Sequence, residues 1–308
     1  MRTAHLVATA TAILMGAASA QASSWTITNY DVPGSAVTQP YGINNSGVIV
    51  GADDLGGFID NHGSVQTINA PGSVSTTLTG ISNSGLVVGA GDTDSFFYQG
   101  GTFTPYAVAG AELTLIRSIS ANGRYAAGIY TTDTDNVGFV YDTTTGTRTD
   151  IVAPAGQAIN VIQGVNDNGV VTGSLVGGVG LVYDLGTNTS TAYTASGEFS
   201  QYRFRAINDE GLIGGWAIEA DDQSTVGIIG TPATGFDTLE VPGAFGTFVY
   251  DINDVGEAIG FWSDADGNAH GFTATLAVPE PSSSALLLMG LAGAGLAARR
   301  RKLDARPA

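Results

Sequence analysis

The stretch Gly42-Ile43-Asn44-Asn45-Ser46-Gly47-Val48-Ile49-Val50-Gly51 recurs along the chain with variations. Each copy places an apolar residue before a polar turn that ends in glycine. The turn glycines stand at positions 47, 85, 123, 169, 211 and 256, which are 38, 38, 46, 42 and 45 residues apart. Repeats of about 40 residues with four short strands each are typical of β-propeller blades. The spacing therefore favours an all-β, six-bladed propeller of four-stranded blades.

The second copy shows the expected strands most clearly, at residues 77–81, 86–89, 95–98 and 102–106. Pro105 suits an outer edge strand, where a missing N–H costs least. Gly89 ends the second strand, and we expect a residue without Cβ there because blades converge near the axis. In the third copy the step from Gly123 to Gly128 is one residue longer than its counterparts, which predicts a bulge near Tyr125.

The sixth copy has three strands, the last at 271–276, and lacks a fourth. An isolated strand at 25–32 precedes the first copy, and it resembles residues 236–243 before the sixth. We expect this N-terminal strand to complete the last blade, because the pairing closes the ring and removes two open sheet edges. The propeller domain is predicted over residues 23–277.

Composition limits the partners of this domain. The chain has 44 glycines in 308 residues, 13% charged residues and no cysteine, so disulfide and thiolate chemistry are excluded. Between residues 23 and 277 there are 26 acidic residues and five basic ones, giving 5 − 26 = −21. Such a surface repels nucleic acid and anionic membranes. It serves either solubility outside the cell or attraction of cationic partners. The five basic residues are Arg117, Arg124, Arg148, Arg203 and Arg205.

Both ends of the chain carry export signals. Residues 1–22 read as a signal peptide, with Arg2, an apolar run and small residues around two candidate cleavage sites. The alternative, a retained anchor, needs a longer apolar run. Residues 278–308 contain an apolar segment at 285–298, predicted to enter the membrane, and then the basic tail Arg299-Arg300-Arg301-Lys302. We expect membrane attachment only through this segment, before processing.

The tail Val278-Pro279-Glu280-Pro281, its apolar segment and its basic end resemble the PEP-CTERM sorting signal of Gram-negative bacteria. The resemblance implies recognition by an exosortase, cleavage and transfer to the cell surface or medium, with a link to the biofilm matrix. Residues 40–276 resemble the extracellular HAF repeats, which carry no activity to transfer. These repeats are named for a His-Ala-Phe tripeptide before the third strand of each copy. His270-Gly271-Phe272 keeps the histidine of this tripeptide, and Phe58, Phe96 and Phe139 keep only its phenylalanine.

Few residues suggest catalysis. No Gly-x-Ser-x-Gly motif occurs, and His62 and His270 are expected to be a turn residue and a packed strand residue. Acidic loops follow the second strand of five blades, and we expect them to ring one mouth of the channel. Candidate calcium ligands there are Asp133, Asp135, Asp264, Asp266 and Asn268, although Asp and Asn are also ordinary turn residues.

These observations favour an exported, non-enzymatic module that binds a glycan or matrix protein through its loops, with no cofactor other than possible calcium. The alternatives are a metal-assisted propeller enzyme acting on extracellular polysaccharide, and a rigid spacer without a ligand. Opposed carboxylates or a metal at the channel mouth would favour the enzyme.

Overall fold

A computed structural model describes residues 25–92 and 94–276. These residues form 24 β-strands and no helix, which confirms the all-β prediction. No helix in these two ranges is long and apolar enough to cross a membrane. The predicted signal peptide at 1–22, the sorting motif and the apolar segment at 285–298 lie outside the described residues.

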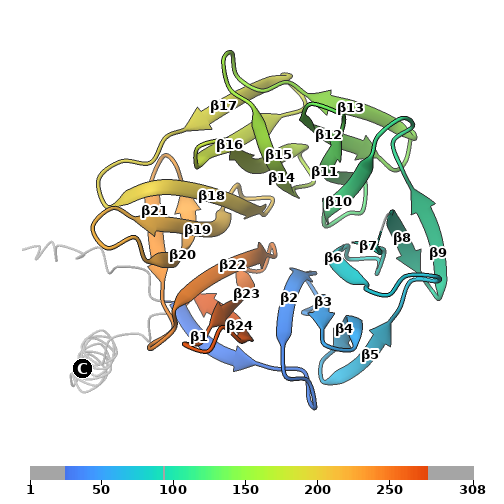
Figure 1. The fold of residues 1–308 in the computed structure, drawn as a ribbon, viewed down its shortest axis with the longest axis horizontal. Helices are drawn as coiled ribbons and strands as arrows, with labels where there is room; N and C mark the ends of the chain where they lie inside the picture. The colour runs from blue at the N-terminus through green and yellow to red at the C-terminus, as the bar shows by residue number, and fades with distance from the viewer. Residues whose placement is uncertain (1–24, 93, 277–308) are drawn as a thin grey trace, which may run out of the picture.

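The strands form sheets arranged in a ring around a central axis, as the propeller prediction requires (Figure 1). Four of the sheets are separate and contain four antiparallel strands each, ordered outward from the axis. Their strands are β2 (Thr38–Ile43), β3 (Ile49–Asp53), β4 (Gly56–Asn61) and β5 (Ser64–Ile68); β6 (Thr77–Ile81), β7 (Val87–Ala90), β8 (Ser95–Gln99) and β9 (Thr102–Tyr106); β10 (Leu113–Ile119), β11 (Tyr125–Thr131), β12 (Asn136–Asp142) and β13 (Thr147–Ile151); and β14 (Ile159–Val165), β15 (Val170–Leu175), β16 (Val179–Asp184) and β17 (Thr189–Tyr193).

The rest of the ring is one eight-stranded sheet, so the prediction of six separate blades is wrong in this respect. Its two halves are joined by a single parallel pair, Thr225 with Gly246, because β22 begins beside the start of β20. Its strands are β18 (Phe199–Ile207), β19 (Ile213–Glu219), β20 (Thr225–Thr231), β21 (Gly235–Leu239), β22 (Gly246–Ile252), β23 (Glu257–Ser263), β24 (Ala269–Leu276) and β1 (Trp25–Tyr30).

The N-terminal strand closes the ring, as predicted. β1 pairs antiparallel with β24, with Ile27 opposite Ala274 and Thr28 opposite Thr273. The Tyr30 hydroxyl donates a hydrogen bond of 2.9 Å to the carboxylate of Asp60 on β4, which belongs to the first sheet. The first and last parts of the chain are therefore held together both within one sheet and between sheets.

The hydrophobic core lies between neighbouring sheets, and the third strand of most repeats contributes a buried phenylalanine to it. Phe58, Phe96, Phe139 and Phe272 are buried, and each pairs with a glycine of the second strand. A Cβ on Gly51 would lie 2.2 Å from the carbonyl oxygen of Gln39 and 2.7 Å from the Phe58 ring. These glycines therefore make room within their own sheet, which corrects the expectation that they serve the approach of neighbouring blades.

The turns after the innermost strands are linked around one mouth of the channel, which we call the turn face. There the side chains of Asn44, Asn166, Asn208 and Asn253 are buried, and each donates to a backbone carbonyl in the corresponding turn of the next repeat around the ring. In Asn253, Nδ2 donates to the Asn44 carbonyl at 3.0 Å while Oδ1 accepts from the N–H of Glu257 at 2.8 Å. The repeated asparagine thus closes its own turn and binds the neighbouring one.

Candidate functional site

Every innermost strand has a register shift at the same place in its pairing with the second strand, which inserts an extra residue there. β14 and β18 each have a second shift nearer their start, at Asn160 and Ser200. In β10 the shift falls between Ile116 and Ser118, so Arg117 is the extra residue, whereas Tyr125 pairs regularly with Asp142. The bulge predicted near Tyr125 is therefore wrongly placed, and a bulge is common to all repeats. The six extra residues are Tyr41, Thr79, Arg117, Gln163, Arg205 and Tyr250.

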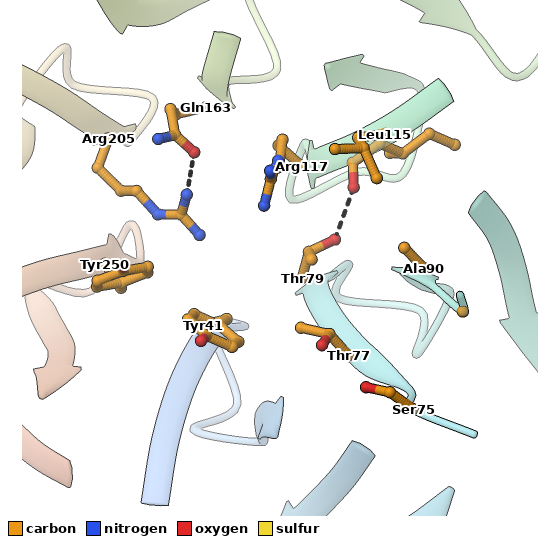
Figure 2. Close-up of a pocket in the computed structure, with 12 residues that line it drawn as sticks. Tyr41, Ser75, Thr77, Thr79, Ala90, Leu115, Arg117, Gln163, Arg205 and Tyr250 are labelled. Atoms are coloured by element: carbon orange, nitrogen blue, oxygen red, sulfur yellow. Dashed lines mark hydrogen bonds between the residues drawn. The ribbon is translucent and has the colours of Figure 1, made fainter. Parts of the chain in front are cut away.

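These six bulge residues line one cavity of about 360 Å³ in the central channel. Figure 2 shows Arg117, Gln163 and Arg205 directed into a space that Tyr41 and Thr79 bound on the other side. Because an inserted residue changes which side of the strand its neighbours face, the bulge directs these side chains toward the axis.

The cavity reaches the mouth opposite the turn face. Ser75, Ala90 and Gly91 line it there; Ser75 precedes β6, and Gly91 follows β7. We call this mouth the loop face, because it carries the loops between second and third strands and those between sheets. Asp92 joins the two kinds of loop by accepting hydrogen bonds of 2.7 Å and 2.9 Å from the N–H groups of Val74 and Ser75. On the turn face the channel leaves a space of only about 30 Å³.

Arg205 is the most buried charge in the cavity, with 4% of its surface exposed. Its guanidinium donates to Oε1 of Gln163 and lies 4.0 Å from the ring centre of Tyr250 and 5.7 Å from that of Tyr41. Its Nε is buried and has no hydrogen-bond partner. Burial lowers the pKa of Arg205 to about 10, and the nearby charge of Arg117 acts in the same direction. The side chain remains a cation at neutral pH.

Arg117 is a second cation in the same space. Its Nε is also buried without a partner, and burial lowers the pKa of its guanidinium. Burial raises the pKa of Tyr41 to about 12, so this phenol stays neutral. None of the residues lining the cavity is Asp or Glu. The site can therefore bind and orient an anionic group, whereas the paired carboxylates used by most glycoside hydrolases are not among these residues.

Asp251 follows the bulge residue Tyr250 and is the carboxylate that acts on Arg205 through space. Its two oxygens accept hydrogen bonds of 2.9 Å from the N–H groups of Ile43 and Ile252. Burial raises the pKa of Asp251 to about 7, against the effect of these N–H donors. Asp251 thus connects the last strands of the ring to the first sheet rather than neutralising the cavity.

The candidate calcium ligands lie in two separate loops of the loop face. Asp264 accepts hydrogen bonds from the N–H groups of Asp266 and Asn268 at 2.9 Å and 2.8 Å, and from Nδ2 of Asn268 at 2.9 Å. Asp133 and Asp135 lie in the loop between β11 and β12. Among residues 25–92 and 94–276, one group of three acidic side chains could share an ion, formed by Glu219, Asp221 and Asp222. Calcium binding stays a prediction.

The two histidines lie apart from the cavity lining. His62 is in the turn between β4 and β5, with a φ of 53°. His270 on β24 stacks on Trp262, with ring centres 4.5 Å apart, and its Nε2 lies 3.4 Å from Oδ2 of Asp264.

Sequence reasoning missed the cavity, although a signal for it was present. Each bulge residue stands at the same distance before its turn glycine, as Tyr41 does before Gly47 and Arg205 before Gly211. Aligning the repeats on these glycines would have placed Arg117, Arg205 and Gln163 in one column.

Comparison with known protein families identifies a motif at the C-terminal end of the sequence. The PEP-CTERM protein-sorting motif matches residues 277–302, so the resemblance of the tail is confirmed. The motif indicates an exported protein that an exosortase sorts to the cell envelope or surface. No curated protein matches the sequence.

Several solved structures are distantly similar. The putative TolB of Agrobacterium tumefaciens is 13% identical, with a TM-score of 0.46 over 60% of this chain and 69% of that one. TolB of Acinetobacter baumannii is 14% identical, with a TM-score of 0.42 over 58% and 47%. Dipeptidyl peptidase 4 of Porphyromonas gingivalis is 10% identical, with a TM-score of 0.41 over 76% and 43%. The chain covers less than half of the last two proteins.

Proposed function

We propose that this chain, which carries a PEP-CTERM sorting motif, is an exported, non-enzymatic module of the cell surface or biofilm matrix. It binds a glycan or a matrix protein through its loop face. The observation that carries this proposal is the polar cavity of about 360 Å³, which opens on that face and lies within the usual size range of ligand sites.

All six innermost strands are proposed to take part in binding. The eight-stranded sheet consists of two groups of four strands, which the single parallel pair of Thr225 with Gly246 joins. Each group has its own innermost strand with a bulge residue, Arg205 on β18 and Tyr250 on β22. Six innermost strands thus contribute one side chain each to the cavity.

Exposed apolar side chains also favour the loop face as the binding surface. Val74 is 98% exposed in the loop between β5 and β6, and Phe245 is 82% exposed in the loop between β21 and β22. Leu55, Val152 and Val176 lie in loops of the same face and are also exposed. Exposed apolar residues around a polar cavity are common at interaction sites.

Retention of the exported protein on cells or matrix tests this proposal. We expect the Val74→Ser and Phe245→Ser variants to be retained less than the wild type. Val255→Ser is the matched control, because Val255 is 68% exposed in a turn of the opposite face. Equal retention of all three variants would contradict binding through the loop face.

Sorting can be tested separately. Replacing Pro279, Glu280 and Pro281 by alanine removes the residues that the motif provides for the exosortase. We expect the variant to accumulate in the membrane fraction, whereas the wild type reaches the surface or medium. Fractionation followed by immunoblotting measures this, and unchanged release would exclude processing at this motif.

The metal-assisted enzyme remains the second candidate because of the cluster of Glu219, Asp221 and Asp222 on the loop face. If calcium binds the acidic loops, added calcium chloride should raise the unfolding temperature and EDTA should reverse the effect. Asp264→Asn or Asp221→Asn should weaken the response, whereas Glu210→Gln on the turn face should not. An unfolding temperature that does not respond to calcium would exclude these sites.

A further inference from the structure

The arginines of this acidic chain fall into two groups. Arg124 and Arg148 form surface ion pairs with Asp142 and Asp150, at 3.0 Å and 2.9 Å. The other three, Arg117 on β10 and Arg203 and Arg205 on β18, lie on innermost strands. Across 25–92 and 94–276, no carboxylate oxygen lies within 4.0 Å of these three guanidinium groups.

Placing two unpaired cations in one cavity opposes folding. Arg205 is almost completely buried, Arg117 is partly buried, and each charge disfavours the other. Removing such charges from water without a pairing anion is unfavourable. Burial and a specific charged neighbour in one cavity are features of functional sites.

Both guanidinium groups belong to residues that line the cavity, and each has a nitrogen without a hydrogen-bond partner. The Nε atoms of Arg117 and Arg205 are buried and have no partner. A guanidinium group has five N–H donors in a planar fork that matches the two oxygens of a carboxylate. The missing partner is therefore an oxyanion that enters from outside the protein.

The charge of the whole domain favours a singly charged ligand. With −21 between residues 23 and 277, the field around the mouth opposes anions, and it opposes a dianion more than a monoanion. A carboxylate is the monoanion that suits two arginines. The cavity is larger than a carboxylate alone, so it has room for the group that bears it.

The other walls suit a sugar ring. The Tyr41 and Tyr250 rings lie with their centres 5.0 Å apart and form an aromatic wall. Ser75, Thr77 and Gln163 provide hydroxyl and amide groups around the remaining space. Arg205 lies over the Tyr250 ring, so a ring that binds here would contact Tyr41 and the hydroxyl and amide groups.

We propose that Arg117 and Arg205 bind the carboxylate of a hexuronic acid, the free monosaccharide, which enters through the loop face. This inference rests on the proposed function and names its ligand class.

Calorimetric titration of the full-length exported protein tests this site. We expect galacturonate to bind. Galactose lacks the carboxylate, acetate lacks the sugar and sulfate carries two charges, so each of these should bind at least about 10-fold more weakly. Trigalacturonate, with three negative charges, should bind more weakly than the monomer. Tighter binding of trigalacturonate would identify the end of an acidic polysaccharide as the ligand and overturn the choice of the free sugar. Acetate or galactose binding as tightly as galacturonate would overturn the assignment.

Substitutions separate a binding role from a structural one. Arg117→Gln should reduce galacturonate affinity by about 10- to 100-fold, the loss typical of a charged hydrogen bond, without lowering the unfolding temperature of the free protein. Arg148→Gln removes the same charge from the surface and should leave the affinity unchanged. The inference would be overturned if Arg117→Gln bound galacturonate as tightly as the wild type. It would also be overturned if the wild type bound no galacturonate and Arg117→Gln only lowered the unfolding temperature. Retention on cells that still depends on Val74 and Phe245 would leave the proposed function standing.

Discussion

At the second strand of each sheet, one glycine decides whether the adjacent bulge can form. The Gly51 backbone lies against the Gln39 carbonyl and the Phe58 ring, and any side chain there would displace both. The same arrangement recurs at Gly260, where a Cβ would lie 1.9 Å from the Phe248 carbonyl oxygen. These residues thus support the cavity without lining it.

Gly51→Ala should therefore lower the free energy of unfolding by about 1–3 kcal/mol through overpacking. Gly186→Ala is the control, because a Cβ there meets only the Asp184 carboxylate, at 3.2 Å. Urea denaturation of both variants measures the difference. Equal stability of the two would show that the contact at Gly51 relaxes without cost.

Asp251 gives the second prediction at this scale. Its folded-state pKa of about 7 lies above the ordinary value of 3.8, so the folded state binds the proton more tightly than the unfolded state. This site should add stability as the pH falls from about 7 toward 4, by at most about 1.4 kcal/mol per pH unit. Ionisation above pH 7 removes that contribution.

Denaturation of the wild type and Asp251→Asn between pH 5 and pH 8 checks this prediction. The variant has no group that titrates at this position. The wild type should therefore gain stability relative to the variant as the pH is lowered from 8 to 5. Parallel stability profiles would mean that Asp251 is ionised throughout this range.

At the scale of elements, the turns of the innermost strands act as connectors between sheets. Asn253 is 4% exposed, closes its own turn and bonds to the Asn44 turn of the first sheet. The repeated Asn therefore has a structural role, although its conspicuous recurrence could suggest a binding motif. It keeps the turn face narrow, so the cavity opens on the loop face.

Asn253→Ala should destabilise the protein by about 2–4 kcal/mol, because it leaves a buried N–H and a buried carbonyl without their partner. Asn61→Ala, at the exposed end of β4, should change stability by less than about 0.5 kcal/mol. Thermal unfolding followed by circular dichroism compares the two. A small effect at Asn253 would show that water replaces its bonds.

At the scale of the whole molecule, closure makes the first strand part of the last sheet. β1 covers the edge of β24 along six residue pairs, and Trp25, Ile27 and Tyr30 are partly buried. The closed ring keeps all six bulge residues around one cavity. Opening it would separate Tyr41 from Tyr250, whose rings lie on either side of the junction.

A mature chain beginning at Asp31 should lose about 3–6 kcal/mol of stability and aggregate through the uncovered edge of β24. Unfolding temperature and light scattering measure both effects. Thr28→Ala, an exposed position on β1, serves as the control and should behave like the wild type. A shortened chain with unchanged stability would show that closure does not depend on β1.

The sequence alone was enough to predict the strands of each repeat, the role of β1 and the sorting motif. These features depend on local patterns: alternation, turn glycines and a missing fourth strand that only 25–32 could supply. The pairing of β1 with β24 followed because a closed ring leaves no unpaired edge.

Only the tertiary structure decided what the channel contains. One extra residue in each innermost strand reverses which side chains face the axis, and alternation along the sequence does not reveal where that insertion falls. Arg117 and Arg205 come from strands that are 88 residues apart in the chain, since 205 − 117 = 88, and they meet because the ring brings every innermost strand to one axis. Which charges share a cavity is set by the closure of the whole ring, and no single repeat contains that information.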